Sequence, residues 1–252
     1  MTSIRTQQPT NWLHHSTELT GSLGGNVHVE PNTIVIWSDV GCPWASLAVH
    51  RLHAARSRLG LDDTVAFDHR AFPLELHNER PTSWNGLAAE VPVVGALAPD
   101  MGWSGWHGPP WRWPVTMLLA LEAVQAAKEQ GLHASDRLDV ALRRAFFADS
   151  ECLSLRHVVL EVAAATDGVE VGPLKEALDS GRARPLVMEQ FAASTQDSVR
   201  GSPHLFFADG SDVYNPGVEQ HWDDELDAPV VDSDDPSVFD DLLRRATEAA
   251  GE

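Results

Sequence analysis

The chain contains few cysteines: Cys42 and Cys152 are the only two among its 252 residues. Two cysteines cannot build the disulfide framework of a small secreted protein, and their scarcity agrees with a reducing compartment. Long apolar runs are also missing, since the longest ones are far too short to span a bilayer. Residues 1–9 carry no apolar stretch typical of a secretory signal, so a cytoplasmic location is the default expectation.

Positive charge is scarce as well. Lys and Arg together number 18 against 37 Asp and Glu, which gives a formal net charge of −19 at pH 7. This excess of negative charge disfavours nucleic acids and anionic membranes as partners, because their phosphates would be repelled. Much of the acid lies in the C-terminal portion, for example in residues 223–227 and 232–235, whose spacing lacks the glycine and distal glutamate of a calcium loop. We expect solvated acidic loops there and no metal site.

A cysteine stands between a predicted strand and a predicted helix. Residues 33–37 form a compact β-rich run, and residues 43–59 combine a helix-starting proline with apolar residues at helical spacing. A thiol at a helix N-terminus faces unpaired N–H groups and the positive end of the helix dipole, which favour the reactive thiolate. Alternation over residues 65–71 predicts a second strand, so the chain opens as a parallel β-α-β unit.

The middle of the chain changes character. Residues 73–113 are rich in Pro, Gly and Trp, and we expect a long ordered loop there. From residue 114 to about residue 196, apolar spacing predicts four or so consecutive helices that pack as a subdomain. Residues 203–207 and 212–215 then read as a hairpin, and Asp235 with Pro236 predicts the start of a last helix.

Three local motifs carry a resemblance to a known family. Residues 38–45, Ser-Asp-Val-Gly-Cys-Pro-Trp-Ala, are close to an Asp-x-x-Cys-Pro-Trp-Cys segment, and residues 200–203, Arg-Gly-Ser-Pro, precede a predicted strand. Residues 114–131 followed by Arg-Ala-Phe-Phe-Ala at 144–148 form the third motif. In this order they resemble the DsbA-like branch of the thioredoxin fold, in particular its FrnE-like and 2-hydroxychromene-2-carboxylate isomerase group.

The resemblance implies an α/β thioredoxin-like fold with an inserted helical subdomain. Residues 33–72 and 200–250 would form the thioredoxin-like core, and residues 73–199 the Trp-rich loop and the insertion. Residues 1–32 are expected to be an irregular N-terminal extension, because they show no clear periodicity.

The resemblance also assigns roles to residues. Cys42 would be the nucleophile, and Pro43 and Trp44 would shape the surface beside it. Pro203 would be the cis-proline that sits against the cysteine, and the backbone of Ser202 would pair with an extended thiol substrate as a strand pairs with a sheet edge.

Ala45 stands where a dithiol enzyme has its second cysteine, so an internal disulfide cannot release the product. Three functions remain open. Cys42 could act as a monothiol oxidoreductase that an external small thiol, such as glutathione, resolves. The site could instead bind such a thiol and run an isomerase or transferase reaction on an aromatic compound. A degenerate, non-catalytic binding module is the third alternative.

Two interpretations remain open for each of the other candidate site residues. The four tryptophans within residues 103–113 either form a lid over the cysteine, with Trp111 as a substrate contact, or simply bury a long loop. His204 either turns toward Cys42 and lowers its pKa as an imidazolium, or points into solvent or the sheet. Cys152 is either a buried structural cysteine or a resolving one. The sequence also leaves open whether the chain forms a homodimer.

Overall fold

The computed structural model describes residues 27–196 and 199–248, so most of the predicted N-terminal extension lies outside the described residues. A four-stranded sheet in the order β2-β1-β3-β4 forms the centre. Strands β1 (Thr33–Ser38) and β2 (Ala66–Ala71) run parallel, while β3 (His204–Phe206) lies antiparallel to β1 and to β4 (Asp212–Tyr214). The predicted β-α-β opening and the hairpin of β3 and β4 are confirmed.

Both faces of the sheet are covered, so every residue of β1 is buried. Helices α1 (Pro43–Arg58) and α9 (Val238–Glu248) pack on one face, where Ile34 and Ile36 meet Leu52 and Leu243. The alternate residues of β1 face the other way, and Trp37 packs there with Phe72 and Phe206. A strand buried on both faces reads as a continuous apolar run, which is why β1 is recognisable in the sequence.

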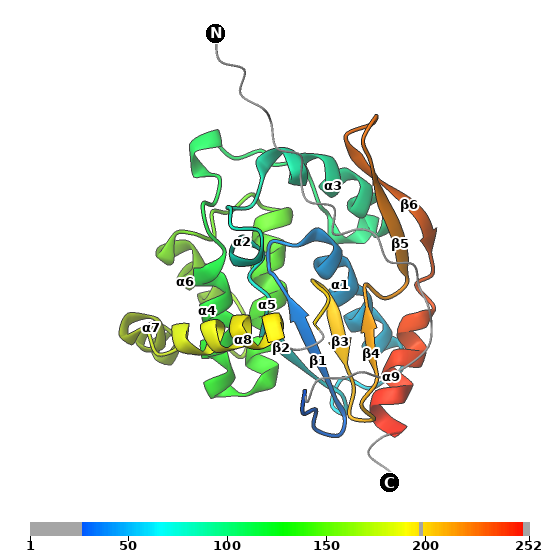
Figure 1. Ribbon diagram of the computed structural model, residues 1–252. Coiled ribbons are helices and arrows are strands. Elements are labelled where there is room, and N and C mark those ends of the chain that lie inside the picture. The colour runs from blue at the N-terminus through cyan, green and yellow to red at the C-terminus, as the bar shows by residue number, and fades with distance from the viewer. Residues whose placement is uncertain (1–26, 197–198, 249–252) are drawn as a thin grey trace.

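A block of helices packs against the β2 side of the sheet (Figure 1). Its interior is a continuous apolar core that includes Leu121, Leu138 and Leu153. The predicted helical block is confirmed, with five α-helices rather than about four. They are α4 (Leu118–Ala127), α5 (Leu132–Phe147), α6 (Arg156–Ala164), α7 (Val171–Ser180) and α8 (Arg184–Gln196).

The expectation of a long loop over residues 73–113 is wrong for a large part of that segment. It contains α2 (Leu74–His77), α3 (Trp84–Leu97) and the short 3-10 helices η1 (Pro99–Met101) and η2 (Pro110–Arg112). Helix α3 forms in spite of an internal proline at Pro92, because Leu87, Val91 and Val94 bury one helical face. Packing therefore outweighs the low helix propensity of its Pro and Gly residues.

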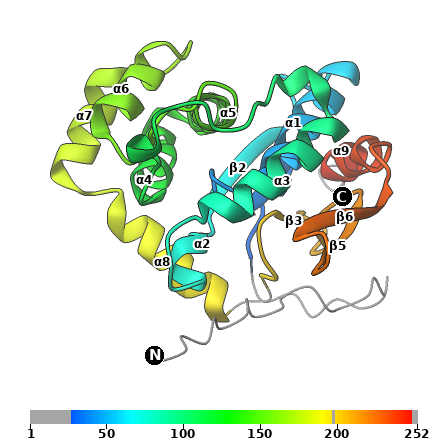
Figure 2. The same cartoon turned by 90° about the horizontal axis from the view of Figure 1, so that it is seen from above.

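The expectation of acidic loops near the C-terminus is also corrected. Strands β5 (Val218–Asp223) and β6 (Ala228–Asp234) pair as a separate antiparallel hairpin, and only residues 224–227 form its turn. Val218 and Val231 turn toward the core, while the acidic residues Glu219 and Asp232 are exposed. Figure 2 shows α3 lying between the helical block and this hairpin. Within the described ranges, no helix is long and apolar enough to cross a membrane.

Candidate thiol site at Cys42

The fold places Cys42 directly after the turn that follows β1. Cys42 is the capping residue before α1, and Pro43 occupies the first helical position, as predicted. The thiol donates a hydrogen bond to the backbone oxygen of Ser202, with 3.3 Å between Sγ and oxygen. The Cys42 side chain is only 5% exposed. Two segments 160 residues apart in the sequence therefore meet at one sulfur atom.

The segment around Ser202 is held to the Cys42 turn by a second contact. The backbone N–H of Asp39 donates to the Ser202 hydroxyl at 3.0 Å. The Ser202 carbonyl that accepts from Cys42 belongs to the peptide bond with Pro203, and this bond is cis. The structure thus brings Cys42, Ser202 and Pro203 together.

An apolar cluster covers the thiol. Cys42 packs with Trp44 and Ala45 from its own helix, with Val94 from α3 and with Val218 from β5. Ala45, where a dithiol enzyme would carry its second cysteine, is completely buried. Helix α3 and the β5–β6 hairpin, the two elements that the sequence pattern concealed, are therefore the cover of the site.

The prediction that the helix N-terminus activates this thiol is wrong. Burial raises the pKa of Cys42 to about 11, which outweighs the lowering by its hydrogen bond to Ser202 and by the backbone N–H of Ala45. The carboxylates of Glu90 and Asp39 raise this pKa further. The hydrogen bonds around Cys42 favour the thiolate, but the loss of water around that charge raises the pKa by more than they lower it.

Asp39 organises the turn before the cysteine. Its carboxylate accepts hydrogen bonds from the backbone N–H of Gly41 at 2.7 Å and of Leu74 at 2.8 Å. Burial raises the pKa of Asp39 to about 6, although these two hydrogen bonds and the positive charge of Arg143 act in the opposite direction.

Glu90 is a site residue that sequence reasoning missed. It lies on α3 and accepts a hydrogen bond from the indole N–H of Trp44 at 3.2 Å. Burial raises the pKa of Glu90 to about 7, so the group titrates near neutral pH beside the thiol. The one local signal is an acid among the apolar residues of a segment that was expected to be a loop.

His204 does not activate Cys42. Its Nδ1 accepts a hydrogen bond from the Arg200 backbone N–H at 3.1 Å, so the ring proton lies on Nε2, 2.7 Å from the carboxylate of Asp212. Burial lowers the pKa of His204 to about 4, which keeps the ring neutral at physiological pH. The histidine is a buried sheet residue that packs against Phe206 and Tyr214.

The tryptophans of residues 103–113 divide into two groups. Trp103, Trp106 and Trp113 pack with Phe146 and Phe147 of α5, so they bury the connection, and Trp103 also touches the Cys42 cluster. Trp111 is 85% exposed on η2. The structure therefore does not bring Trp111 to the thiol cluster.

Cys152 lies in the connection between α5 and α6, and its side chain is buried. Both cysteines are free thiols. A cavity of about 490 Å³ lies elsewhere, on the outer side of α1, and is lined by α1, the end of α3 and the start of α9. Its charged residues are already paired with one another, for example Arg51 with Asp234 at 2.6 Å.

Comparisons with known proteins agree with this geometry. A model of the family described as "DSBA-like thioredoxin domain" matches residues 33–228. A probable DsbA oxidoreductase from Streptomyces coelicolor superposes with a TM-score of 0.61 at 20% identity, covering 87% of this chain and 90% of that one. A search of curated proteins finds no match.

The cytosolic disulfide reductase DsbM from Pseudomonas aeruginosa gives a TM-score of 0.52 at 17% identity, covering 86% of this chain and 98% of that one. The structure of DsbM with GSH gives 0.51 at 16% identity, with the same coverage. At these identities the likeness establishes the thioredoxin-like α/β fold that the sequence motifs predicted.

Proposed function

Because the chain belongs to the DSBA-like thioredoxin domain family, we propose that it carries out thiol–disulfide exchange through the single site thiol of Cys42. The observation that carries the proposal is the hydrogen bond from Cys42 Sγ to the Ser202 carbonyl, at 3.3 Å. It places the sulfur beside a backbone segment to which an extended thiol compound can bind. An external small thiol such as glutathione takes the place of the missing second cysteine.

The reaction balances with one substrate disulfide and two equivalents of a small thiol. The Cys42 thiolate attacks one sulfur of a disulfide, the S–S bond breaks, and the other half leaves as a thiolate that takes up a proton. A small thiolate then attacks the substrate sulfur of the mixed disulfide, which releases Cys42 as a thiolate and leaves the substrate half as a disulfide with the small thiol. A second small thiolate attacks the small-thiol sulfur of that product, so the substrate half leaves as a thiolate and the disulfide of the small thiol forms. The substrate disulfide gains two electrons, and the two small thiols that close the cycle lose them.

The Ser202 carbonyl also has a role once Cys42 has formed the mixed disulfide. A sulfur in a mixed disulfide carries no hydrogen, so Cys42 can no longer donate to that carbonyl. The carbonyl is then free to accept a hydrogen bond from an amide N–H of the bound half of the substrate. A peptide-like thiol such as glutathione carries such N–H groups, so the same atom that holds the resting thiol would hold the substrate.

A raised pKa means that the thiolate of Cys42 is poorly stabilised relative to its disulfide-bonded form, which makes the thiol a reductant of substrate disulfides rather than an oxidant of substrate thiols. With a pKa of about 11, only about 10⁻⁴ of Cys42 is thiolate at pH 7, so attack on a disulfide is slow. A thiol of high pKa is also a poor leaving group, so the mixed disulfide is long-lived. This direction matches the reductase description of DsbM, a structural relative that is also described as cytosolic. We propose the cytoplasm for this chain too.

Two other functions keep some support. The burial of Cys42 favours a non-catalytic binding module, in which the thiol is a packing residue. The contact of Trp103 with the Cys42 cluster favours a thiol-dependent isomerase or transferase that acts on an aromatic compound. Thiol chemistry at Cys42 distinguishes the first of these from the proposal, and turnover of an aromatic compound distinguishes the second.

Intact-protein mass after incubation with oxidised glutathione tests the proposal. We expect one glutathione adduct on the wild type and on Cys152→Ser, and none on Cys42→Ser. The rate should rise about tenfold per pH unit between pH 7 and pH 10, since only the thiolate attacks. If folded Cys42 forms no adduct at any pH while the denatured chain does, the proposal fails and the binding-module function replaces it.

A further inference from the structure

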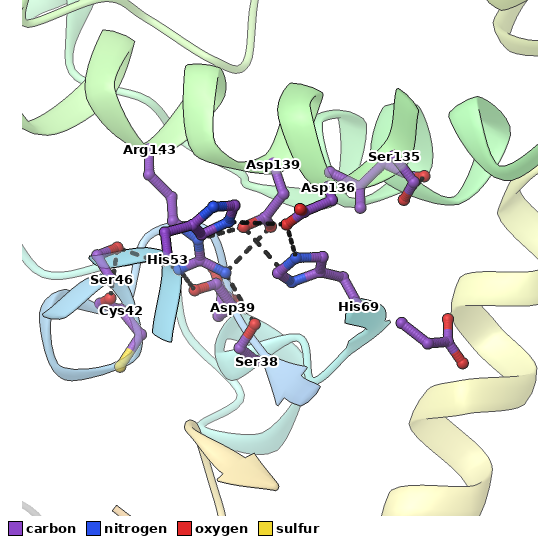
Figure 3. Close-up of polar contacts among 12 residues, drawn as sticks. Ser38, Asp39, Cys42, Ser46, His53, His69, Ser135, Asp136, Asp139 and Arg143 are labelled. Carbon is purple, nitrogen blue, oxygen red and sulfur yellow. Dashed lines mark hydrogen bonds and ion pairs between the residues drawn. The ribbon is translucent and has the colours of Figure 1, made fainter. Parts of the chain in front are cut away.

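The guanidinium of Arg143 lies behind the Cys42 turn, although it comes from α5 in the helical block (Figure 3). An arginine has five N–H donors, and here five hydrogen bonds use them. Two go to the carboxylate of Asp139 at 2.6 and 3.1 Å. The other three go to the Ser38 hydroxyl at 2.8 Å, the Asp39 backbone oxygen at 2.9 Å and the Ser46 hydroxyl at 3.0 Å.

These acceptors flank the cysteine on both sides. The Asp39 carbonyl also accepts the backbone N–H of Cys42 at 3.1 Å, and the Ser46 hydroxyl donates to the Cys42 carbonyl at 3.1 Å. Arg143 is therefore one hydrogen-bonded residue away from both the N–H and the C=O of Cys42. Figure 3 shows the sulfur pointing away from this cluster, so Arg143 contacts the frame of the turn.

The charge of Arg143 is itself held in place. Asp139 is the counter-ion, and both side chains are almost completely buried. Behind Asp139 lies His69, whose Nδ1 is 3.5 Å from the same carboxylate and whose Nε2 is 2.9 Å from Asp136. Asp136 also binds Arg56 of α1. A buried network of charged groups thus joins the helical block to the core.

We propose that Arg143 is the positioning residue of the thiol site: through Ser38, Asp39 and Ser46 it fixes the Cys42 turn so that Sγ stays under its cover and against Ser202. The inference rests on Cys42 being the reacting group, and so deepens the proposed function. It gives the inserted helices a direct part in the site, since the positioning group comes from α5.

The test is Arg143→Lys in a Cys152→Ser background. Lysine keeps the charge but has three donors on one nitrogen, so it cannot hold all the acceptors of Arg143. The turn loosens, water reaches Sγ, and the main cause of the raised pKa weakens. The charged and titratable groups that face Cys42, namely Asp39, Glu90 and Tyr214, are unchanged. We expect the pH midpoint of Cys42 alkylation by iodoacetamide to fall by about one unit.

Arg56→Lys is the matched control. Arg56 is also buried and binds Asp136, but it makes no hydrogen bond to the Cys42 turn. It should lower the melting temperature by a similar amount and leave the alkylation midpoint unchanged. If Arg143→Lys fails to fold, Ser46→Ala removes one of the two routes to Cys42 and should give a smaller shift in the same direction.

Each outcome decides the inference. A shift shared by Arg143→Lys and Arg56→Lys, or no shift in either Arg143→Lys or Ser46→Ala, would overturn it. A Cys42 that stays unlabelled in every folded variant would overturn it as well. If alkylation responds as expected but the wild type forms no glutathione adduct, the positioning role holds and the proposed exchange function fails.

Discussion

The indole N–H of Trp44 donates a hydrogen bond to the carboxylate of Glu90 at 3.2 Å, which ties the helix of the nucleophile to the helix that covers it. Trp44 is two residues after Cys42, so this contact holds a carboxyl group close to the thiol. Burial raises the pKa of Glu90 to about 7, and its negative charge in turn raises the pKa of Cys42. The two groups therefore oppose each other's ionisation.

Glu90→Gln should make Cys42 more reactive. Glutamine keeps an oxygen that accepts the Trp44 hydrogen bond but removes the negative charge, so the pKa of Cys42 falls. We expect the alkylation midpoint of Cys42 to fall by about half a unit to one unit, measured by mass spectrometry across pH. Glu161→Gln, at an exposed position of α6, should change nothing. An unchanged midpoint in Glu90→Gln would show that its charge does not act on the thiol.

The buried His204 makes the free energy of unfolding depend on pH in the acid range. The pKa of His204 falls from 6.5 to about 4 on burial, so the folded state binds the proton less well than the unfolded state. The stability linked to this group is complete above pH 6.5 and is lost as the pH falls toward 4, by about 3 kcal/mol. Urea unfolding of the wild type at pH 7.5 and at pH 4 should show this loss.

His204→Gln should remove that part of the acid sensitivity. Its amide can donate to Asp212 and accept from the Arg200 N–H, as the neutral ring does, but it binds no proton. His221→Gln is the control, because His221 is exposed and its pKa is raised by Asp232, which gives no loss toward acid. Equal acid sensitivity of His204→Gln and the wild type would contradict the assignment.

Elements with a clear apolar period were predictable. The apolar run inside β1, the apolar stripe of α1 and the helices of the block can be read from local spacing alone. Helix α3 was not predictable, because Pro92 and its glycines mimic a loop, and its apolar face has meaning only against its partners. The β5–β6 hairpin was hidden for a different reason: its acidic runs suggest a solvated loop, and the register shift between Glu219 and Gln220 interrupts the strand pattern.

The chemistry of the site was also only partly predictable from the sequence. The motif placed Cys42, Pro43 and Ser202 in the sequence, and the structure brings them together. The pKa of the thiol could not be read from the motif, because the burial that sets it involves Val94 and Val218, far away in the chain. A helix N-terminus is a local feature, whereas loss of water depends on everything that packs around it.

Ala45→Cys should give the chain an internal disulfide. A cysteine there completes Cys-x-x-Cys at the start of α1, and its thiolate can attack a mixed disulfide at Cys42. Ala45 is fully buried, so the added sulfur should cost about 1–3 kcal/mol of unfolding free energy. After oxidised glutathione, the variant should carry no adduct and be lighter by two hydrogen atoms. Ala48→Cys, buried one turn further along α1, should retain the adduct on Cys42.

The backbone at Gly217 helps to hold the β5–β6 hairpin in place over the thiol. It has a φ of +73°, and a Cβ there would lie 2.5 Å from the backbone oxygen of Asp235, whose N–H donates to the Gly217 carbonyl at 2.7 Å. A non-glycine residue in the left-handed conformation costs about 1–2 kcal/mol. Gly217→Ala should therefore reduce the free energy of unfolding by more than this amount, because of the added clash. Gly210→Ala is the control, since Gly210 has a φ of +82° and open space around it.

The same pair of variants tests whether the hairpin shields the thiol. Gly217 precedes Val218, which packs in the Cys42 cluster, so moving the start of β5 should admit water to the sulfur. Cys42 in Gly217→Ala should alkylate faster than in the wild type at a fixed pH, while Gly210→Ala should leave the rate unchanged. Equal stability losses and equal alkylation rates in the two variants would mean that the contact between Gly217 and Asp235 does not hold the cover closed.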